Sequence, residues 1–458
     1  MNSQSITRTF WRYSIPAIAA LMISGLYMVV DGILIGHAMG ATGLSAINMA
    51  WPLSGPMLAI GMMIGMGGGA QCSLAQGAAQ WPEARSYLAQ ALWLLVLLGI
   101  PTGVLVVLSG PAFMAMQGAE GNLAQLGNDY LQVIGWAAPL VFGSIALPLL
   151  VRNLGAPRLA TLAMLVGALT NVALDYLFII VWQWGLHGAA LATVIGESLS
   201  VLICLGFICS RHNPLQMPLA ACTLNLRKSL DILTTGFSSM LMYLYMSLVV
   251  VLHNLLFMHY GSPLQVAAYA IAGYLMAFYY MFAEGVCGGM QPLVSYFYGA
   301  REPDKVRRVL RLGVLTAVGS GLLMTAALLL LPKAFASIFS GSDAALLDAS
   351  ASGIRLHLFA MFLDGFIVLA ASFFQAMDQA RYATLVTVGN MLIQLPFLAI
   401  LPLIWGLNGV WLALPLSNVC LSVVVIWMLW RQLQQLTTLD STPINPIQEQ
   451  PLRPQHNK

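Results

Sequence analysis

The chain has 458 residues, of which 59% are hydrophobic and only 8% are charged. An average soluble domain is about 25% charged, so this composition excludes an ordinary soluble domain and indicates an integral membrane protein. The formal net charge of +3 is too small to suggest a nucleic-acid partner.

Twelve apolar runs are long enough to span a bilayer, whose core needs about 20 residues per helix. Their approximate limits are 14–36, 46–74, 88–110, 129–151, 159–183, 187–209, 232–258, 266–297, 309–331, 354–376, 383–405 and 409–431. The runs are continuous rather than alternating, which excludes a β-barrel. The sequence therefore predicts an all-α membrane protein with twelve transmembrane helices.

The positions of lysine and arginine predict the orientation, because these residues favour cytoplasmic loops. If the N-terminus is cytoplasmic, 17 of the 19 lysines and arginines lie in inner segments. The outer segments then hold only Lys333 and Arg355. We expect a multi-pass protein with both termini in the cytoplasm.

An internal repeat divides the chain into two similar halves. Three ordered matches recur at a nearly constant offset: "GMGGGAQ" (65–71) with "GVCGGMQ" (285–291), "RLATL" (158–162) with "RYATL" (381–385), and "WGLHGAALA" (184–192) with "WGLNGVWLA" (405–413). Each half holds six predicted helices, so the halves share one orientation. A parallel repeat of this kind is typical of transporters.

The repeat and the local composition together divide the chain into four predicted segments. These are an N-terminal six-helix bundle (1–210), a cytoplasmic linker loop (211–230), a C-terminal six-helix bundle (231–436) and a disordered cytoplasmic tail (437–458), which is polar and contains proline.

No motif for catalysis or energy coupling is present in the sequence. It contains no phosphate-binding GxxxxGK[ST] loop, no Ser/His/Asp constellation, and no cysteine pair or metal-ligand spacing among its six cysteines. We therefore expect neither an enzyme nor a bound cofactor or metal. Two homologous bundles without such a motif favour secondary transport by alternating access.

Acidic residues within the predicted spans are the functional candidates. They are Asp31, Asp175, Glu197, Glu284 and Asp364, and no lysine or arginine is central in a span. Such a residue is costly in lipid, by about 2.5–3.5 kcal/mol on insertion scales. It can carry a proton, bind Na⁺ or pair with a cationic substrate. The alternative is a protonated carboxyl group that only bonds helices together.

Asn171 and Asp175 are separated by one helical turn, so they share one helix face. An amide beside a carboxyl group supplies both a donor and an acceptor, and can hold it in either protonation state.

At these residues the sequence resembles the multidrug and toxic compound extrusion (MATE) family, over essentially the whole chain. The similar stretches are "VVDGILIGHAMG" (29–40), "NVALD" (171–175), "HGAALAT" (187–193) and "QPLVSYFYGA" (291–300). Each motif alone is weak, and their order together with the repeat makes the combination specific.

The resemblance implies a V-shaped pair of six-helix bundles that exports lipophilic, often cationic compounds in exchange for H⁺ or Na⁺. It also implies a cation-coupling site in the N-terminal half, which carries over to Asp31, Tyr130, Asn171, Asp175 and Thr193. We expect a monomer in a bacterial inner membrane.

Asp364 and Glu284 form a second candidate cation site. Asp364 in "FLDGFIV" resembles a helix-10 aspartate of some Na⁺-coupled members, but the glutamate that those members carry on helix 7 is missing here. Glu284 on helix 8 matches no motif of the family.

Intramembrane aromatic residues are candidates for the substrate cavity, because their rings attract flat cations. The set comprises Tyr27, Trp136, Phe142, Tyr243, Tyr274, Phe278 and Tyr279, of which Tyr27, Trp136, Tyr274 and Phe278 are preferred. For each of them, packing in the core or against lipid is the alternative.

Three other functions remain open. A flippase for lipid-linked sugars would need arginine or lysine in its cavity to hold a pyrophosphate. An unrelated twelve-helix carrier of the major facilitator type should show a basic glycine-containing signature after helix 2, which "AQGAAQWPEARSYL" (75–88) fits poorly. A membrane protein that transports nothing would not need the acidic residues.

Overall fold

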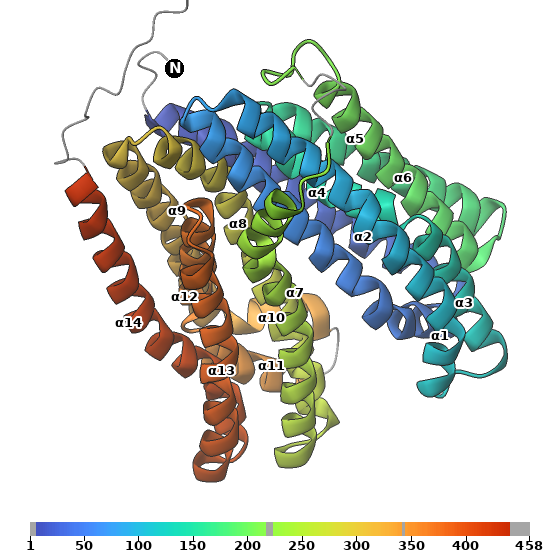
Figure 1. The fold of residues 1–458 in the computed structure, drawn as a ribbon. Coiled ribbons are helices and arrows are strands. Elements are labelled where there is room, and N and C mark those ends of the chain that lie inside the picture. The colour runs from blue at the N-terminus through green and yellow to red at the C-terminus, as the bar shows by residue number, and fades with distance from the viewer. Residues whose placement is uncertain (1–5, 217–222, 341–343, 440–458) are drawn as a thin grey trace, which may run out of the picture.

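The computed structural model describes residues 6–216, 223–340 and 344–439, which are almost entirely helical (Figure 1). The first half contains α1 (Ile6–Gly77), α2 (Trp81–Met116), α3 (Gly121–Trp136), α4 (Ala138–Asn153), α5 (Pro157–Asp175), the π-helix η1 (Tyr176–Val181) and α6 (Gly185–Ile208). The second half contains α7 (Leu226–Tyr260), α8 (Pro263–Gly299), α9 (Pro303–Leu330), α10 (Pro332–Ser340), α11 (Ala344–His357), α12 (Met361–Ala376), α13 (Ala380–Trp405) and α14 (Leu407–Leu439). Residues 440–458 of the predicted tail and 217–222 of the predicted linker lie outside the described residues.

The helices account for the twelve predicted spans. Nine segments of the described chain are long and apolar enough to cross a membrane, and two of them, Ile6–Met39 and Thr42–Gly77, follow each other within α1. The bent pairs α3 with α4 and α11 with α12 pass the same test. With its 35 residues, α7 supplies the twelfth span. The prediction of an all-α, twelve-helix membrane fold is confirmed.

The fourth span of each half is broken rather than straight. The axes of α3 and α4 meet at 61° across Ala137, and those of α11 and α12 meet at 49°. Pro139 at the start of α4 accounts for the first break, because proline has no N–H to donate to the carbonyl oxygen of Gly135 in α3 and its ring clashes with that carbonyl. The second break follows His357, at the corresponding place in the repeat and without a proline. The two halves therefore share this bend although only one of them carries a sequence signal for it.

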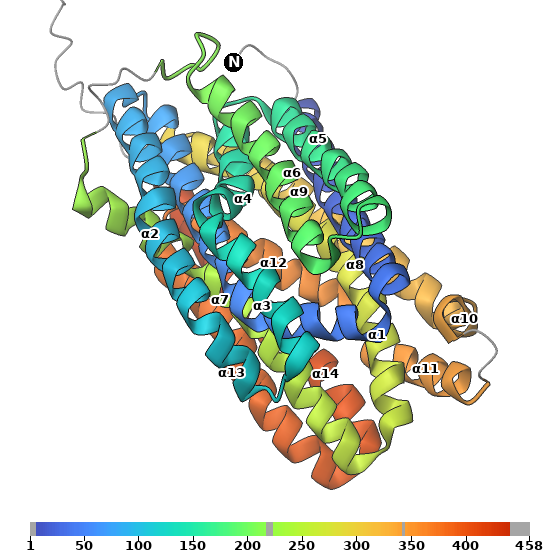
Figure 2. The same cartoon turned by 90° about the vertical axis from the view of Figure 1, so that its right-hand side faces the viewer.

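The two halves form the arms of a V (Figure 1). The start of α1 and the end of α14 lie at the same end of the molecule, where the arms meet, and the arms diverge toward the opposite end. Figure 2 shows the first half from its outer side, with α3, α4 and α6 in front of α12. The hydrophobic core forms one cluster mainly in the first half, which also includes Ile232 of α7, and two clusters mainly in the second, one of which includes Phe10 of α1.

Where the arms meet, two helix ends related by the repeat touch through backbone. Gly77 ends α1 and its counterpart in the second half, Gly299, ends α8. A Cβ atom on Gly77 would lie 2.0 Å from the carbonyl oxygen of Tyr296, and one on Gly299 would lie 2.1 Å from that of Leu74. Only glycine at both positions allows this reciprocal approach.

A buried glutamine holds the beginning of the second half against the first. The side chain of Gln90 on α2 is fully buried and donates to the carbonyl oxygen of Thr223 at 2.8 Å. Its Oε1 accepts hydrogen bonds from the backbone N–H of Asn225 at 2.8 Å and from Ser229 Oγ at 3.3 Å. Asn225 in turn caps α7 by accepting from the N–H of Lys228. The register of α7 therefore depends on a side chain of α2.

Replacing Gln90 by leucine should lower the free energy of unfolding by about 1–3 kcal/mol, because buried polar partners would lose their hydrogen bonds. Thermal unfolding of the purified protein in detergent measures this effect. Gln117→Leu is the control, since the Gln117 side chain is exposed while bonding the Met49 carbonyl oxygen. Equal unfolding temperatures for the two variants would contradict the anchoring role of Gln90.

Candidate functional site

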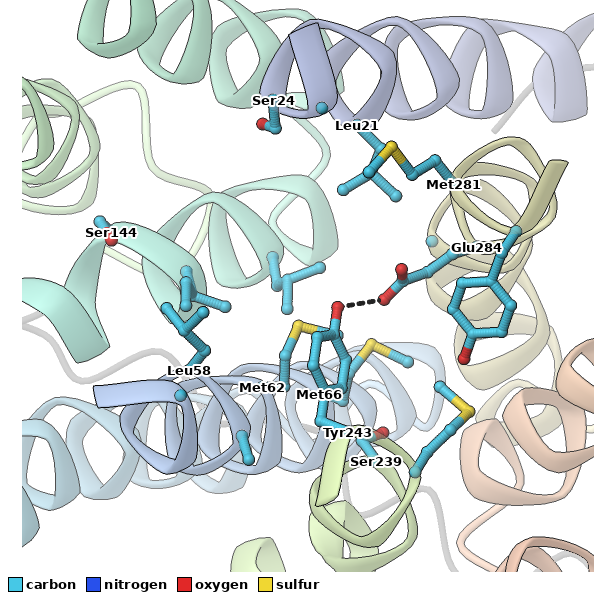
Figure 3. Close-up of a pocket in the computed structure, with 18 of the residues that line it drawn as sticks. Leu21, Ser24, Leu58, Met62, Met66, Ser144, Ser239, Tyr243, Met281 and Glu284 are labelled. Carbon is cyan, nitrogen blue, oxygen red and sulfur yellow. Dashed lines mark hydrogen bonds between the residues drawn. The ribbon is translucent and has the colours of Figure 1, made fainter. Parts of the chain in front are cut away.

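A cavity of about 820 Å³ lies between the two halves, which is a volume that suits a drug-sized ligand. Helices α1, α4, α5 and α6 line it from one side, and α7, α8, α12 and α13 from the other. Its wall is mainly apolar and includes five methionines: Met62, Met66, Met164, Met242 and Met281. Figure 3 shows several of these side chains around the space. Methionine is flexible and polarisable, so this wall can adapt to ligands of different shape.

A polar cluster occupies the interior of the first half beside this cavity. Asp175 on α5 is completely buried, and no hydrogen bond of ordinary geometry reaches either of its carboxyl oxygens from the described residues, although the Asn171 side chain lies close enough to act on it. The carboxyl group of Asp31 on α1 lies close enough for its charge to act on Asp175. One oxygen of Asp31 is also without a partner in the described structure. Two neighbouring carboxyl groups with unused oxygens can take up a small cation.

Asn171 connects this cluster with α6. Its amide nitrogen donates to Thr193 Oγ1 at 3.4 Å, while its Oδ1 has no hydrogen-bond partner among the described residues. Asn171 and Thr193 also line the central cavity, whereas Asp31 and Asp175 do not. The cluster is therefore separate from the cavity but joined to it by these two side chains.

The remaining residue of the predicted first-half site, Tyr130, lies on α3 in the core of the same half and is 9% exposed. The structure thus brings Asp31 of α1 near Asp175 of α5, which is distant in the sequence, and Asn171 of α5 into contact with Thr193 of the following helix α6. Their role in binding a cation stays a prediction.

Two glycines allow α5 and α6 to approach closely enough for this contact. A Cβ atom on Gly167 would lie 2.8 Å from the carbonyl oxygen of Gly196, and one on Gly196 would lie 2.6 Å from that of Gly167. The Gly196 Cβ would also lie 3.0 Å from the Cβ of Asn171. Close packing of the two backbones therefore sets the position of Asn171.

The helix geometry changes immediately after Asp175. The α-helical pattern of α5 ends there and the chain continues as the π-helix η1. The ring of Phe178 stacks on those of Trp182 and Trp184, with centroids 5.2 and 5.0 Å apart, and thereby packs the end of this turn. Single π-turns inside helices occur frequently at functional sites. The sequence predicted a regular helix here, because no residue pattern distinguishes a π-turn.

Asp364 and Glu284 do not form one site in the structure. Asp364 on α12 accepts a hydrogen bond of 2.6 Å from Asn418 Nδ2 on α14 and does not line the central cavity. Glu284 on α8 does line it and accepts a 2.7 Å hydrogen bond from the hydroxyl of Tyr243 on α7, drawn in Figure 3. Only Glu284 can meet a ligand in the cavity.

The cavity also contains two charged side chains that the sequence did not assign to it. Glu197 on α6 lines it, and one of its carboxyl oxygens is buried without a partner among the described residues. Arg152, in the last turn of α4, lines it as well and is 3% exposed. The sequence places Arg152 just beyond a predicted span, and it does not reveal whether a side chain near a helix end turns toward solvent or into the cavity.

Three of the four preferred aromatic candidates for the substrate cavity lie outside it. Trp136, Tyr274 and Phe278 are 69%, 63% and 54% exposed, and none of them lines the cavity. The side chain of Tyr27 lies outside the described part of the structure. Among the aromatic residues at the cavity are Tyr243 and Tyr280. Hydrophobicity alone cannot separate these faces, since lipid and cavity both accept an aromatic ring.

Comparison with known proteins gives a family model, described as MatE, that matches residues 16–177 and again 238–400. One model thus fits each half once, and the spacing of the two matches agrees with that of the paired motifs, which confirms the internal repeat. Together the matches cover more than half of the chain.

Related proteins and structures extend over nearly the whole length. The multidrug export protein MepA of Staphylococcus saprophyticus is 23% identical over 431 residues, covering 93% of this chain and 95% of the relative. The crystal structure of a MATE transporter in complex with MaL6 superposes with a TM-score of 0.89 at 22% identity, covering 96% of this chain and 98% of the other. An outward-facing multidrug resistance MATE transporter reaches 0.87 at 23% identity with the same coverage. These structures share the V-shaped fold.

Replacing Gly196 by alanine should separate α5 from α6 and lower the free energy of unfolding by about 1–3 kcal/mol, as overpacking of a tight contact does. Gly206→Ala, on the same helix, is the control, because a Cβ there meets nothing within 4 Å and alanine favours helix. Thermal unfolding in detergent would show a lower midpoint for the first variant only. If both variants unfold like the wild type, the close contact does not position Asn171.

Proposed function

We propose that this chain, which belongs to the multidrug and toxic compound extrusion (MATE) family of efflux transporters, is an antiporter that exports lipophilic or cationic compounds in exchange for H⁺ or Na⁺. The observation that carries the proposal is the buried, unbonded carboxyl group of Asp175 beside an apolar cavity of drug size. The bacterial relatives and the apolar helices support a location in a bacterial inner membrane.

In the proposed cycle, the coupling cation binds at Asp31 and Asp175. Two close carboxylates repel each other in a low-dielectric interior, so a proton or Na⁺ shared between them relieves the repulsion. The unbonded Oδ1 of Asn171 offers a further oxygen ligand. Since Asn171 also lines the cavity, cation binding can alter the wall that a substrate contacts. Coupling requires only that cation and substrate prefer different conformations.

Alternating access would require the junction of the two arms to open. At this junction Gln71 of the first half donates to Thr235 Oγ1 at 2.9 Å and to the carboxylate of Asp378, both in the second half. Gln291, the counterpart of Gln71 in the repeat, accepts a hydrogen bond of 3.0 Å from Asn153 of the first half. Burial raises the pKa of Asp378, and the hydrogen bonds from Thr235 and Gln71 oppose this shift. These reciprocal hydrogen bonds would have to break for the junction to open.

The distribution of positive charge supports a cytoplasmic position for this closed junction. The ends of α1 and α14 that begin and end the described chain lie on its side of the molecule (Figure 1). With that orientation the arms diverge toward the outside, and the structure corresponds to the state that releases substrate and receives the coupling cation.

A flippase for lipid-linked sugars is the alternative, and Arg152 in the cavity favours it. A pyrophosphate would need several cations, however, and among the described cavity-lining residues Arg152 stands beside two carboxylates, Glu197 and Glu284. This balance of charge favours a positively charged substrate over a pyrophosphate.

Asp175→Asn should abolish export driven by a cation gradient, because an amide cannot exchange a proton and is a poorer ligand for Na⁺. Efflux of ethidium from proteoliposomes is measured under a pH gradient alone and then under a Na⁺ gradient alone. Loss of at least about tenfold is expected under whichever gradient drives the wild type.

Asp304→Asn is the matched control and should retain efflux, since Asp304 is an exposed carboxylate in the first turn of α9, outside both candidate cation sites and the cavity. Gradient-driven export that survives Asp175→Asn would contradict the coupling role. No efflux by the wild type under either gradient would favour the flippase.

Gly77→Ala should prevent full closure of the junction, because its Cβ would lie 2.0 Å from the Tyr296 carbonyl oxygen. The six native cysteines are first replaced by serine. A single cysteine introduced at Ser24, which lines the cavity, then reports whether a reagent in solution can enter the cavity. An impermeant maleimide added from the cytoplasmic side should label it severalfold faster in the variant. Gly273→Ala, whose Cβ meets nothing within 4 Å, is the control. Unchanged labelling in Gly77→Ala would contradict a gate at this position.

A further inference from the structure

The central cavity carries opposite charges contributed by the two halves. Arg152 comes from α4 of the first half and Glu284 from α8 of the second. They are near enough for the Glu284 charge to act on the guanidinium. Nevertheless, the ion pairs found among the described residues include neither side chain. Both charges therefore face the same space without neutralising each other directly.

Arg152 and Glu284 each have hydrogen-bonding groups that their contacts within the described structure do not use. Arg152 Nη1 donates to the carbonyl oxygen of Gly288, one turn beyond Glu284, at a long 3.5 Å, and its Nε has no partner among the described residues. Glu284 is held on one oxygen by the Tyr243 hydroxyl at 2.7 Å. A guanidinium has five N–H donors in a planar fork that matches a carboxylate.

The fold itself does not require the charge at position 152. The repeat aligns "RNLGAPR" (152–158) with "QAMDQAR" (375–381), so Gln375 is the equivalent of Arg152 in the second half. Gln375 also lines the cavity, and its amide bonds the carbonyl oxygen of Thr235 at 2.8 Å. A neutral side chain thus fills the equivalent position in the second half. An unpaired buried charge is costly, and the fold does not need one here. The charge of Arg152 therefore indicates that this side chain binds a ligand.

Building on the proposed export of lipophilic compounds, we propose that Arg152 and Glu284 form a two-pole recognition site for zwitterionic amphiphiles. Glu284, oriented by Tyr243, pairs with the cationic group of the substrate, and Arg152 binds its carboxylate through the guanidinium fork. The apolar wall accommodates the body of the molecule. Because Glu197 offers a second carboxylate in the cavity while Arg152 is the one cation among its described lining residues, selectivity for zwitterions depends most on Arg152.

Two dyes that differ at one group test this proposal. Rhodamine 110 carries a cationic ring system and a free carboxylate, and rhodamine 123 is its methyl ester, which keeps only the positive charge. Binding to the purified full-length protein in detergent is followed by fluorescence anisotropy. The wild type should bind rhodamine 110 more tightly. Arg152→Gln should lower the affinity for rhodamine 110 by about tenfold or more, as expected for loss of a charge-assisted hydrogen bond. It should lower the affinity for rhodamine 123 by less than about threefold.

The matched control is Arg158→Gln, which removes the same charge from an exposed position a few residues away that does not line the cavity. It should leave both affinities unchanged. If Arg152→Gln does not yield folded protein, Arg152→Lys takes its place, because it keeps the charge and loses the fork. A fall in the affinity for rhodamine 110 of at least severalfold, with rhodamine 123 unchanged, then supports the proposal.

Equal effects of the Arg152 variant on the two dyes, or no preference for rhodamine 110 in the wild type, would overturn the two-pole site while leaving drug export intact. Failure of the wild type to bind either dye would overturn both the two-pole site and the proposed function.

Discussion

An unpaired carboxyl group is costly in a low-dielectric interior, and this protein depends on the way it encloses such groups. Asp175 is completely buried, no hydrogen bond of ordinary geometry reaches its oxygens from the described residues, and Asp31 lies near it. The close packing of α5 on α6 through Gly167 and Gly196 shields this cluster from lipid and directs Asn171 toward the cavity. A group held at such a cost is sensitive to any cation that reaches it, which is the property a coupling site needs.

The two halves repeat one architecture and differ in chemistry. Both break their fourth span, and both end a helix on a glycine at the junction. The alignment of "RLATL" with "RYATL" places the buried, uncharged Leu398 opposite Asp175. The alignment of "GMGGGAQ" with "GVCGGMQ" likewise pairs Glu284 with the buried Ile64. One duplicated scaffold thus carries the carboxyl cluster and the cavity carboxylate Glu197 in its first half, and the cavity carboxylate Glu284 in its second.

The sequence predicted those parts of the site that depend on spacing within one helix, and it missed those that depend on contacts between helices. Asn171 and Asp175 were identified because a spacing of one helical turn fixes their common face whatever surrounds them. Arg152 was missed because it lies near a helix end, where the sequence does not show whether a side chain turns outward or inward. Trp136 was placed in the cavity because lipid and protein both accept apolar residues at the surface of a membrane helix. The sequence also did not show that Asp364 and Glu284 belong to different sites. Asp364 accepts a hydrogen bond from Asn418, on another helix, and this contact is visible only in the structure.

The sequence by itself determined the class, the number of spans, the repeat and the positions of the buried acids, because hydrophobic length, charge and helix periodicity are local properties of the chain. The tertiary structure alone decided which residues face the cavity, where the helices bend and where the π-turn follows Asp175. These features depend on contacts between different helices, such as that of α4 with α8 across the two halves and that of α5 with α6 within the first half. No local pattern records such contacts, since they arise only when the helices pack together.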